Sequence, residues 1–288
     1  MSIIKQCMIV NLFISNWTGY RLDKEMTRKV TEDAVADSDA ARVNKHLVPK
    51  ESFKEVVSAS GALRTHFYDK TLPWSDNGDR LLTRLSYMDF MAEHSRLFDD
   101  WKSAVHDFLT VKYPSARDQA AFRMGAMFKA SDYPSPGELQ YKFGVKLDIS
   151  PVATANDFRV EMDQVTTDAI RAEIEQAMQD KVAGAMRDLW DRLSVTVNHF
   201  AATMDQEDKI FRDSTVKNLE DIVESLPALN FLNDPRLTEI GNDLKAAIIG
   251  YSPKELRKDA QVRQNAAREA QNIAAKMAGF MAAFKTQQ

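Results

Sequence analysis

Hydrophobic residues recur at three- and four-residue intervals through much of the chain, the spacing that places them on one face of an α-helix. The longest such pattern runs from Thr166 to about Thr203. A second starts near residue 80 and extends to Lys112, which predicts a helical rod of about 50 Å at 1.5 Å per residue. Few globular helices run beyond about 25 residues without a partner helix, so we expect these two to pack as antiparallel neighbours.

Shorter helices are predicted between these patterns and after them. Pro114 either ends the second long helix or restarts it, because proline lacks the amide that would continue the hydrogen-bond ladder. Ser135 and Pro136 suit the N-cap and the first position of another helix. The remaining helical patterns lie near residues 23–36, 51–68, 114–130, 206–226, 235–250 and 253–284.

Strands are predicted at three places, near residues 8–14, 144–150 and 157–162. The first is short and rich in large apolar residues, and the other two alternate apolar and polar residues around "ATAN", which predicts a hairpin. Two strands alone are marginal, so the first should join them in a small antiparallel sheet of about three strands. The expected fold class is α+β, predominantly α, with long antiparallel helices packed on this sheet.

The stretch "TLPWSDNGDRLL" combines a tryptophan, turn-forming residues and two aspartates in front of the second long helix. Asp76 or Asn77 can accept amide hydrogen bonds at the start of that helix, and Trp74 can pack against its first turn at Leu81 or Leu82. This interpretation leaves Arg80 without a partner. Trp74, Asp76 and Arg80 are therefore candidates for an interaction site.

Composition narrows the classes of protein. The formal net charge of −4 lacks the basic excess of a general nucleic-acid binder. The single cysteine, Cys7, excludes an intramolecular disulfide and a thiolate zinc cluster and fits a reducing cytoplasm. The apolar run "CMIVNLFI" is interrupted by Asn11 and is interpreted as a strand instead of a leader peptide. Nothing approaches the roughly 20 apolar residues of a membrane helix.

Catalytic and metal-binding patterns were sought and not found. The five histidines do not pair at the four-residue spacing that places two imidazoles on one helix face. Phosphate-binding loops and nucleophile elbows are also missing from the sequence. We therefore predict no enzyme activity, no cofactor and no metal. Arg159 in "DFRVEM" and Arg212 beside Asp213 stay open between a structural ion pair and a ligand contact.

The C-terminal segment, residues 251–288, is predicted to form an amphipathic helix apart from a single domain of residues 1–250. Its apolar face is defined by steps of four, three and four residues, at Ile273, Met277, Phe280 and Phe284. The segment also carries seven basic residues against three acidic ones. A basic helix of this kind favours either packing or a protein contact, with nucleic-acid binding in recombination or replication as the alternative.

Several motifs in order, "TLPWSDNGDRLL", "DYPSPGELQYKFGVKLDISPV", "DFRVEM" and "FRDSTVKNLEDIVESLPALNFLNDPRL", resemble an uncharacterised bacterial and phage family known as a domain of unknown function. The similarity spans about residues 8–250. Members of that family are encoded near MoxR-type AAA ATPases and von Willebrand A domain proteins. The resemblance implies a phage or mobile-element protein that serves as an adaptor or substrate of such an ATPase, and it assigns no catalytic residues.

Together these observations lead to one functional expectation. We expect a cytoplasmic protein of phage type that acts by binding other proteins and that associates with itself through long helices of coiled-coil character.

Overall fold

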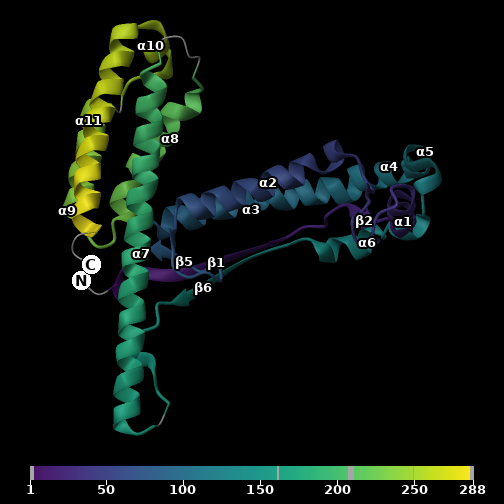
Figure 1. The fold of residues 1–288 in the computed structure, drawn as a ribbon, viewed down its shortest axis with the longest axis horizontal. Coiled ribbons are helices and arrows are strands. Elements are labelled where there is room, and N and C mark those ends of the chain that lie inside the picture. The colour runs from purple at the N-terminus through teal and green to yellow at the C-terminus, as the bar shows by residue number, and fades with distance from the viewer. Residues whose placement is uncertain (1–2, 161, 207–210, 249, 286–288) are drawn as a thin grey trace. The chain divides into compact units, whose positions relative to one another are not determined.

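The computed structural model describes residues 3–160, 162–206, 211–248 and 250–285. It is predominantly helical with a small antiparallel sheet, so the α+β fold class is confirmed (Figure 1). The sheet has four strands where about three were predicted, and a separate two-stranded sheet accompanies it. The helices of the described residues are α1 (Lys24–Asp33), α2 (Lys50–Asp69), α3 (Tyr87–Asp107), α4 (Tyr113–Asp118), α5 (Ala120–Met124), α6 (Pro136–Leu139), α7 (Gln164–Met204), α8 (Asp213–Leu229), α9 (Pro235–Ala247), α10 (Pro253–Lys258) and α11 (Ala260–Lys285).

The chain divides into two compact units, each built from separate stretches of sequence. Unit 1 contains the chain up to Asn11, Tyr68–Phe90 and the described residues from Asp148 onward. Unit 2 contains Leu12–Phe67 and Met91–Leu147. This division differs from the predicted one at residue 250, because α11 belongs to the same unit as the helices before it.

The four-stranded sheet has the order β4-β5-β1-β6. Its strands are β1 (Cys7–Ser15), β4 (Leu72–Pro73), β5 (Arg80–Thr83) and β6 (Gly144–Pro151). β1 and β6 lie where strands were predicted. β1 pairs antiparallel with β5, with Cys7 opposite Thr83 and Val10 opposite Arg80. The apolar side chains of β1 therefore reach a buried position next to β5.

The predicted third strand at residues 157–162 is wrong for its described residues. A 3-10 turn, η6 (Ala155–Asp157), is followed by irregular extended chain, and residue 161 lies outside the described residues. The Asp157 carboxylate accepts hydrogen bonds from the Thr154 amide and hydroxyl, both at 2.8 Å, which turns the chain there. β6 pairs with β1 instead of forming the predicted hairpin.

The stretch around Trp74 forms a hairpin, not the start of a helix. β4 and β5 pair antiparallel, and Gly78 closes the loop with φ of +95°. Leu81 is fully buried beside β1, whereas Leu85 and Met88 are 64% and 74% exposed. The helical spacing in this stretch was misleading because a run of only two apolar residues, Leu81 and Leu82, takes its conformation from its pairing partner. Helix α3 begins only at Tyr87.

Unit 1 has a helical core around α7. The Asp163 carboxylate accepts a hydrogen bond from the Thr166 amide at 3.0 Å and caps this helix. α11 and α8 pack on the C-terminal part of α7, where Leu193, Val197 and Phe200 are completely buried (Figure 1). The predicted partner of this long helix was wrong, since residues of α3 from Met91 onward belong to unit 2.

Unit 2 has a core between α2 and α3. The two helices join through large side chains, including Val56, Leu63, Leu97, Trp101 and Val105. Pro114 restarts the helix instead of ending it: α3 passes through a π-helical turn, Phe108–Lys112, and α4 begins at Tyr113. The wider π turn fits a position at which proline cannot donate to the preceding turn.

A second, two-stranded sheet lies in unit 2, where the sequence predicted no strand. β2 (Tyr20–Leu22) pairs antiparallel with β3 (Asn44–His46). Lys45 points inward, and its ammonium lies 2.5 Å from an Asp132 carboxylate oxygen and 3.5 Å from one of Asp23. The three side chains are at most 8% exposed, so an ion cluster joins α1, β3 and the 3-10 turn η4 (Ala130–Asp132).

Candidate functional site

A groove runs along unit 2 between α2 and α3, on a side where the two helices face each other with small residues. We call it the α2–α3 groove. Its volume is about 610 Å³, within the roughly 300–1,000 Å³ typical of ligand sites. Its lining consists of Glu55, Ser58, Ala59, Ala62, Leu97, Asp100, Ser103, Ala104 and Asp107.

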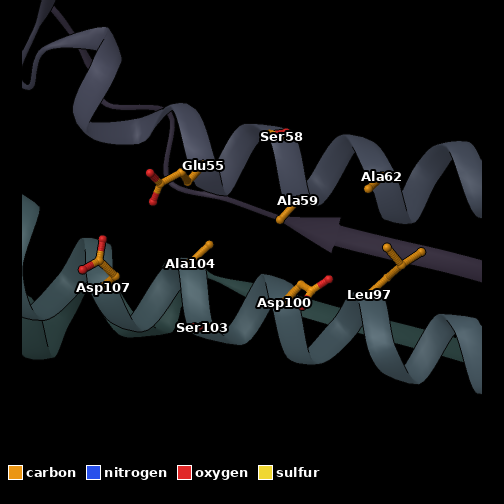
Figure 2. Close-up of a pocket in the computed structure, with 9 residues that line it drawn as sticks. All are labelled: Glu55, Ser58, Ala59, Ala62, Leu97, Asp100, Ser103, Ala104 and Asp107. Carbon is orange, nitrogen blue, oxygen red and sulfur yellow. The ribbon is translucent and has the colours of Figure 1, made fainter.

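The spacing of these residues explains why they share one surface. Within each helix every lining residue has another one three or four positions away, so each set occupies one helix face. Figure 2 shows Glu55 and Ala59 pointing toward α3, and Leu97, Ala104 and Asp107 pointing toward α2. The α3 side extends over ten residues, which is about 15 Å, or nearly three helical turns.

The floor of the groove is formed by alanines. Larger side chains at these positions would fill the groove. Ala59, Ala62 and Ala104 are half-buried and also contact the core between the helices. Large side chains on the other side of the same helices hold them together, as described above. A partner backbone can therefore approach the floor closely, since alanine leaves room for it.

The groove is acidic. Its lining includes three carboxylates and no lysine, arginine or histidine. Lys112 lies beside one end, where it bonds Glu55 and lies 3.0 Å from Asp107, and these contacts raise the pKa of Lys112, the Glu55 hydrogen bond most. Asp100 receives a hydrogen bond of 2.8 Å from Arg96 on the outer side of α3. Each carboxylate has about four acceptor positions, so cations can still bind from within the groove.

The polar chemistry of this lining consists of hydrogen-bond acceptors and negative charge. Its polar groups are three carboxylates and the hydroxyls of Ser58 and Ser103, which accept hydrogen bonds from ammonium, guanidinium and amide groups. The acidic side chains are 43–64% exposed, so salt in the solvent weakens their attraction for cations.

The candidates chosen from the sequence lie elsewhere, all in unit 1. Trp74 is half-buried against the core, and the Lys181 ammonium lies 5.6 Å from its ring centre. Asp76 is exposed in the β4–β5 loop. The predicted clasp between Trp74 and a helix start at Leu81 was wrong, because Leu81 lies in β5.

Arg80, which the sequence left without a partner, is only 9% exposed and has several. Its guanidinium donates to the Thr71 hydroxyl at 2.6 Å and to the Thr71 carbonyl at 2.8 Å, and it lies 4.8 Å from the Tyr68 ring centre. Burial lowers the pKa of Arg80 to about 10, with a further contribution from the charge of Arg192. Arg80 therefore fastens the hairpin to the end of α2.

The other two arginine candidates are exposed. Arg159 lies in the irregular segment before α7, and Arg212 is the residue before the first turn of α8. The contacts expected near Arg212 are made by Arg257, which bonds Asp213 and lies 4.9 Å from the Phe211 ring centre. The five candidates therefore lie in three separate places: the β4–β5 hairpin, the segment before α7 and the start of α8.

The predicted apolar face of the C-terminal helix packs in the core of unit 1. Ile273 and Met277 are buried, Phe280 is half-buried against Trp190, and the side chain of Phe284 lies outside the described residues. The helix predicted at residues 253–284 is divided at Asp259, whose carboxylate accepts hydrogen bonds from the first amides of α11.

Some of the basic residues of this segment already have acidic partners. Lys276 pairs with Glu239 and Asp243, at 2.5 and 2.6 Å, and Arg257 pairs with Asp213. These pairs reduce the local positive excess on which the nucleic-acid alternative rests.

Two further properties bear on the class of protein. Among the described residues, no three His, Cys, Asp or Glu side chains come close enough together to hold a metal ion. Within the described residues, no helix is both long enough and apolar enough to cross a membrane.

Comparison of the chain with protein-family models, with curated proteins and with solved structures found no match. The resemblance drawn from the sequence motifs therefore stays a prediction.

The α2–α3 groove was not anticipated from the sequence. Asp99 and Asp100 are adjacent acidic residues in the sequence, yet only Asp100 lines the groove. The usable signal was the run of small residues at Ser58, Ala59 and Ala62 within an otherwise amphipathic helix.

Proposed function

We propose that the chain is a protein-binding protein whose α2–α3 groove receives a helical segment of a partner. The observation that carries this proposal is the combination of a floor of alanines with three carboxylates along a groove of about 15 Å. Helix-in-groove binding is a common mode of peptide recognition, and here the groove favours a helix with small residues on one face and lysine or arginine on its flanks.

Charge complementarity would add specificity and association rate more than affinity. The acidic residues lie toward the solvent-exposed rim, where attraction to a basic segment acts over about 10 Å at 0.1 M salt. Binding should therefore weaken as the salt concentration rises.

The test compares two adjacent aspartates on α3. Asp100 lines the groove and pairs with Arg96, whereas Asp99 lies outside the lining and pairs with Lys102 at 2.7 Å. Both are more than half exposed, so Asp100→Arg and Asp99→Arg make the same change of charge on neighbouring positions of one helix.

The probe is a synthetic helical peptide with alanines on one face and lysines on both flanks, followed by fluorescence anisotropy. We expect binding to the unmodified chain and to Asp99→Arg, and an affinity at least tenfold lower, about 1.4 kcal/mol, for Asp100→Arg. A version of the peptide with glutamate in place of lysine should not bind. Equal affinity for the two variants, or equal binding of both peptides, would refute the assignment of the groove.

The family resemblance supplies a candidate partner for this groove, a MoxR-type AAA ATPase, with the chain as its adaptor or substrate. The same pair of variants tests this part of the proposal in co-expression experiments. Asp99→Arg should still co-purify with the ATPase and Asp100→Arg should not.

The nucleic-acid alternative requires a different experiment, because removing the chain after Gly250 would take away helices that pack in the core of unit 1. Exposed basic residues such as Lys254, Lys258 and Arg268 can be changed to glutamine instead. A salt-dependent gel shift that these changes abolish would support that function over the one proposed.

A further inference from the structure

A second pocket in unit 2 lies against the ribbon that strands β1 and β6 form, and its volume is about 540 Å³. We call it the β1–β6 pocket. It is lined by Leu12–Ser15 of β1, Gly144–Lys146 of β6 and Arg64 of α2. All of these residues belong to unit 2, and the α2–α3 groove has a different lining. The volume lies within the range typical of small-ligand sites.

The two faces of the ribbon differ, because successive side chains of a strand point to opposite sides. Ile14 and Val145 pack on the core between α2 and α3, so their face is the covered one. Phe13 and Ser15 therefore lie on the other face, where Phe13 is 51% exposed and Ser15 is exposed as well. An aromatic ring of the pocket lining is thus open to solvent.

The β1–β6 pocket is basic, in contrast to the α2–α3 groove. Its charged residues are Arg64 and Lys146, both exposed, and its lining contains no aspartate or glutamate. Lys146 already takes part in another interaction, so the assignment rests on Arg64. Among the residues that the structure describes, the Arg64 side chain has no ion-pair or hydrogen-bond partner. Its guanidinium can therefore bind a phosphate through two parallel hydrogen bonds.

The smallest residue of the lining, Gly144, lies next to Ser15. A Cβ at this position would lie 3.0 Å from Ser15 Oγ, which is closer than an ordinary contact, so a larger residue would press on the hydroxyl. The exposed hydroxyl can donate one hydrogen bond. It therefore adds a neutral donor for an anion to the charged donor of Arg64.

These groups together define the class of ligand. A nucleobase stacks on an exposed aromatic ring, and the phosphate that accompanies it binds guanidinium and hydroxyl donors. We propose that the β1–β6 pocket binds a nucleotide, with the base stacked on Phe13 and the phosphate held by Arg64. A free nucleotide and one nucleotide of a single strand offer the same chemistry. This inference is independent of the α2–α3 groove.

The test measures binding of two probes to the full chain at low salt. Adenosine monophosphate represents a free nucleotide and is followed by isothermal titration calorimetry. A fluorescein-labelled single strand of about six thymidines represents nucleic acid and is followed by fluorescence anisotropy. Binding of either probe supports the proposal: the strand alone would identify the ligand as part of a polymer, and the monophosphate would identify it as a free nucleotide.

Substitutions at the two contacts give separate expectations. Phe13→Leu keeps an apolar side chain and removes the ring, so affinity should fall at least fivefold, whereas Phe13→Tyr keeps the ring and should bind like the unmodified chain. Arg64→Gln removes the cation, so affinity should fall at least tenfold. For the strand, the slope of log K against log salt should also decrease in magnitude by about 0.7 in Arg64→Gln.

Matched controls remove a ring and a cation outside the pocket. Phe122→Leu removes a ring that is 97% exposed on α5, and Lys54→Gln removes an ammonium from a side chain that is 74% exposed on α2. Both controls should bind the probes like the unmodified chain.

Three results would overturn the proposal. The first is that neither probe binds at low salt. The second is binding that Phe13→Leu and Arg64→Gln leave unchanged. The third is a loss of affinity in Phe122→Leu and Lys54→Gln as large as in the pocket variants, which would show binding elsewhere on the surface.

Discussion

Replacement of Lys45 by methionine provides the sharpest test of how unit 2 is held together. The Lys45 ammonium donates to the Met127 carbonyl at 3.1 Å and pairs with Asp132 and Asp23. Methionine keeps most of the length of the side chain and removes the charge. The substitution therefore leaves the buried Asp23 without its ion-pair partner and leaves Asp132 with only Arg21, which is 3.4 Å away and 60% exposed.

The magnitude follows from that arrangement. Removal of one partner of a buried ion pair costs about 3–5 kcal/mol, because the remaining charge stays desolvated. We expect about 3 kcal/mol, the lower end, since an aspartate can take up a proton in the variant. For a cooperative unit of roughly 110 residues with an unfolding entropy of about 2.1 cal/mol/K per residue, this corresponds to a melting temperature lower by roughly 10–15 °C.

The assay is urea denaturation of the full chain followed by tryptophan fluorescence, with Lys129→Met as the control. Lys129 pairs with Glu25 at 3.6 Å, and both side chains are more than half exposed. Such a pair contributes about 0–1 kcal/mol, so the control should lose much less stability. Losses of similar size in the two variants would refute the claim that the Lys45 cluster is a buried structural pair.

The cluster also has a predicted dependence on pH. The pKa of Asp23 is lowered, first by the Met26 amide that donates to it and then by the charge of Lys45. Its contribution to stability is present above the unfolded pKa of about 3.9 and is lost as the pH falls through the lower folded value. Burial lowers the pKa of Lys45, but the hydrogen bond to Asp132 and the charges of Asp132 and Asp23 raise it more. The pKa of Lys45 is therefore higher than its ordinary value.

The contribution of Lys45 is accordingly complete below the unfolded pKa of about 10.4 and is lost as the pH rises through the folded value. In the unmodified chain, protonation of Asp23 at low pH removes the attraction between its carboxylate and Lys45, which Lys45→Met already lacks. The stability difference between the two proteins should therefore narrow as the pH falls below about 4. A difference that stays constant to lower pH would contradict this account.

Three other substitutions test separate features. Arg80→Met should cost about 2 kcal/mol in urea denaturation, because it removes charged hydrogen bonds to Thr71, and an unchanged midpoint would contradict the role of Arg80 in fastening the hairpin. Gly78→Ala should cost about 1–2 kcal/mol, since φ is +95° there while a Cβ would meet only ordinary contacts; a neutral result would contradict the strain argument. Burial lowers the pKa of His94, as does the neighbouring His66, so stability should fall as the pH drops from about 6.5 through the folded pKa. In His94→Leu, thermal denaturation should show a weaker loss of stability as the pH falls below about 6.5. An unchanged dependence on pH would show that other groups cause this loss.

The sequence predicts well the elements whose pattern is long and continuous. The periodicity from Thr166 onward identified α7, and the apolar run at residues 8–14 identified β1. In both cases the pattern that identifies the element lies within the element's own sequence. Pro114 was correctly singled out as a point of interruption for the same local reason, the missing amide.

The errors concern which elements come together. A short apolar run such as the one at Leu81 fits a helix or a strand equally, and pairing with β1 decides between them. The hairpin expected after β6 failed because β1, far away in the sequence, pairs with that strand instead. Such choices depend on contacts between distant residues, which hydrophobic spacing does not encode.

The α2–α3 groove was out of reach for the same reason. It exists because two particular helices pack through large residues on one side and small residues on the other. The sequence analysis paired α3 with α7 instead of α2. Under that prediction Glu55 on α2 and Asp107 on α3 would not lie on the same surface.

The interleaved construction of the two units has a consequence for the order in which they fold during synthesis. Unit 2 is complete once Leu147 has left the ribosome, so its core can close early. Unit 1 begins with β1 but needs α11 to cover α7, and its contacts join the most distant parts of the described sequence. Contacts of such long sequence separation form slowly, which leaves the apolar face of α7 exposed until α11 has been synthesised. A nascent chain of this design would depend on chaperones for unit 1 and much less for unit 2.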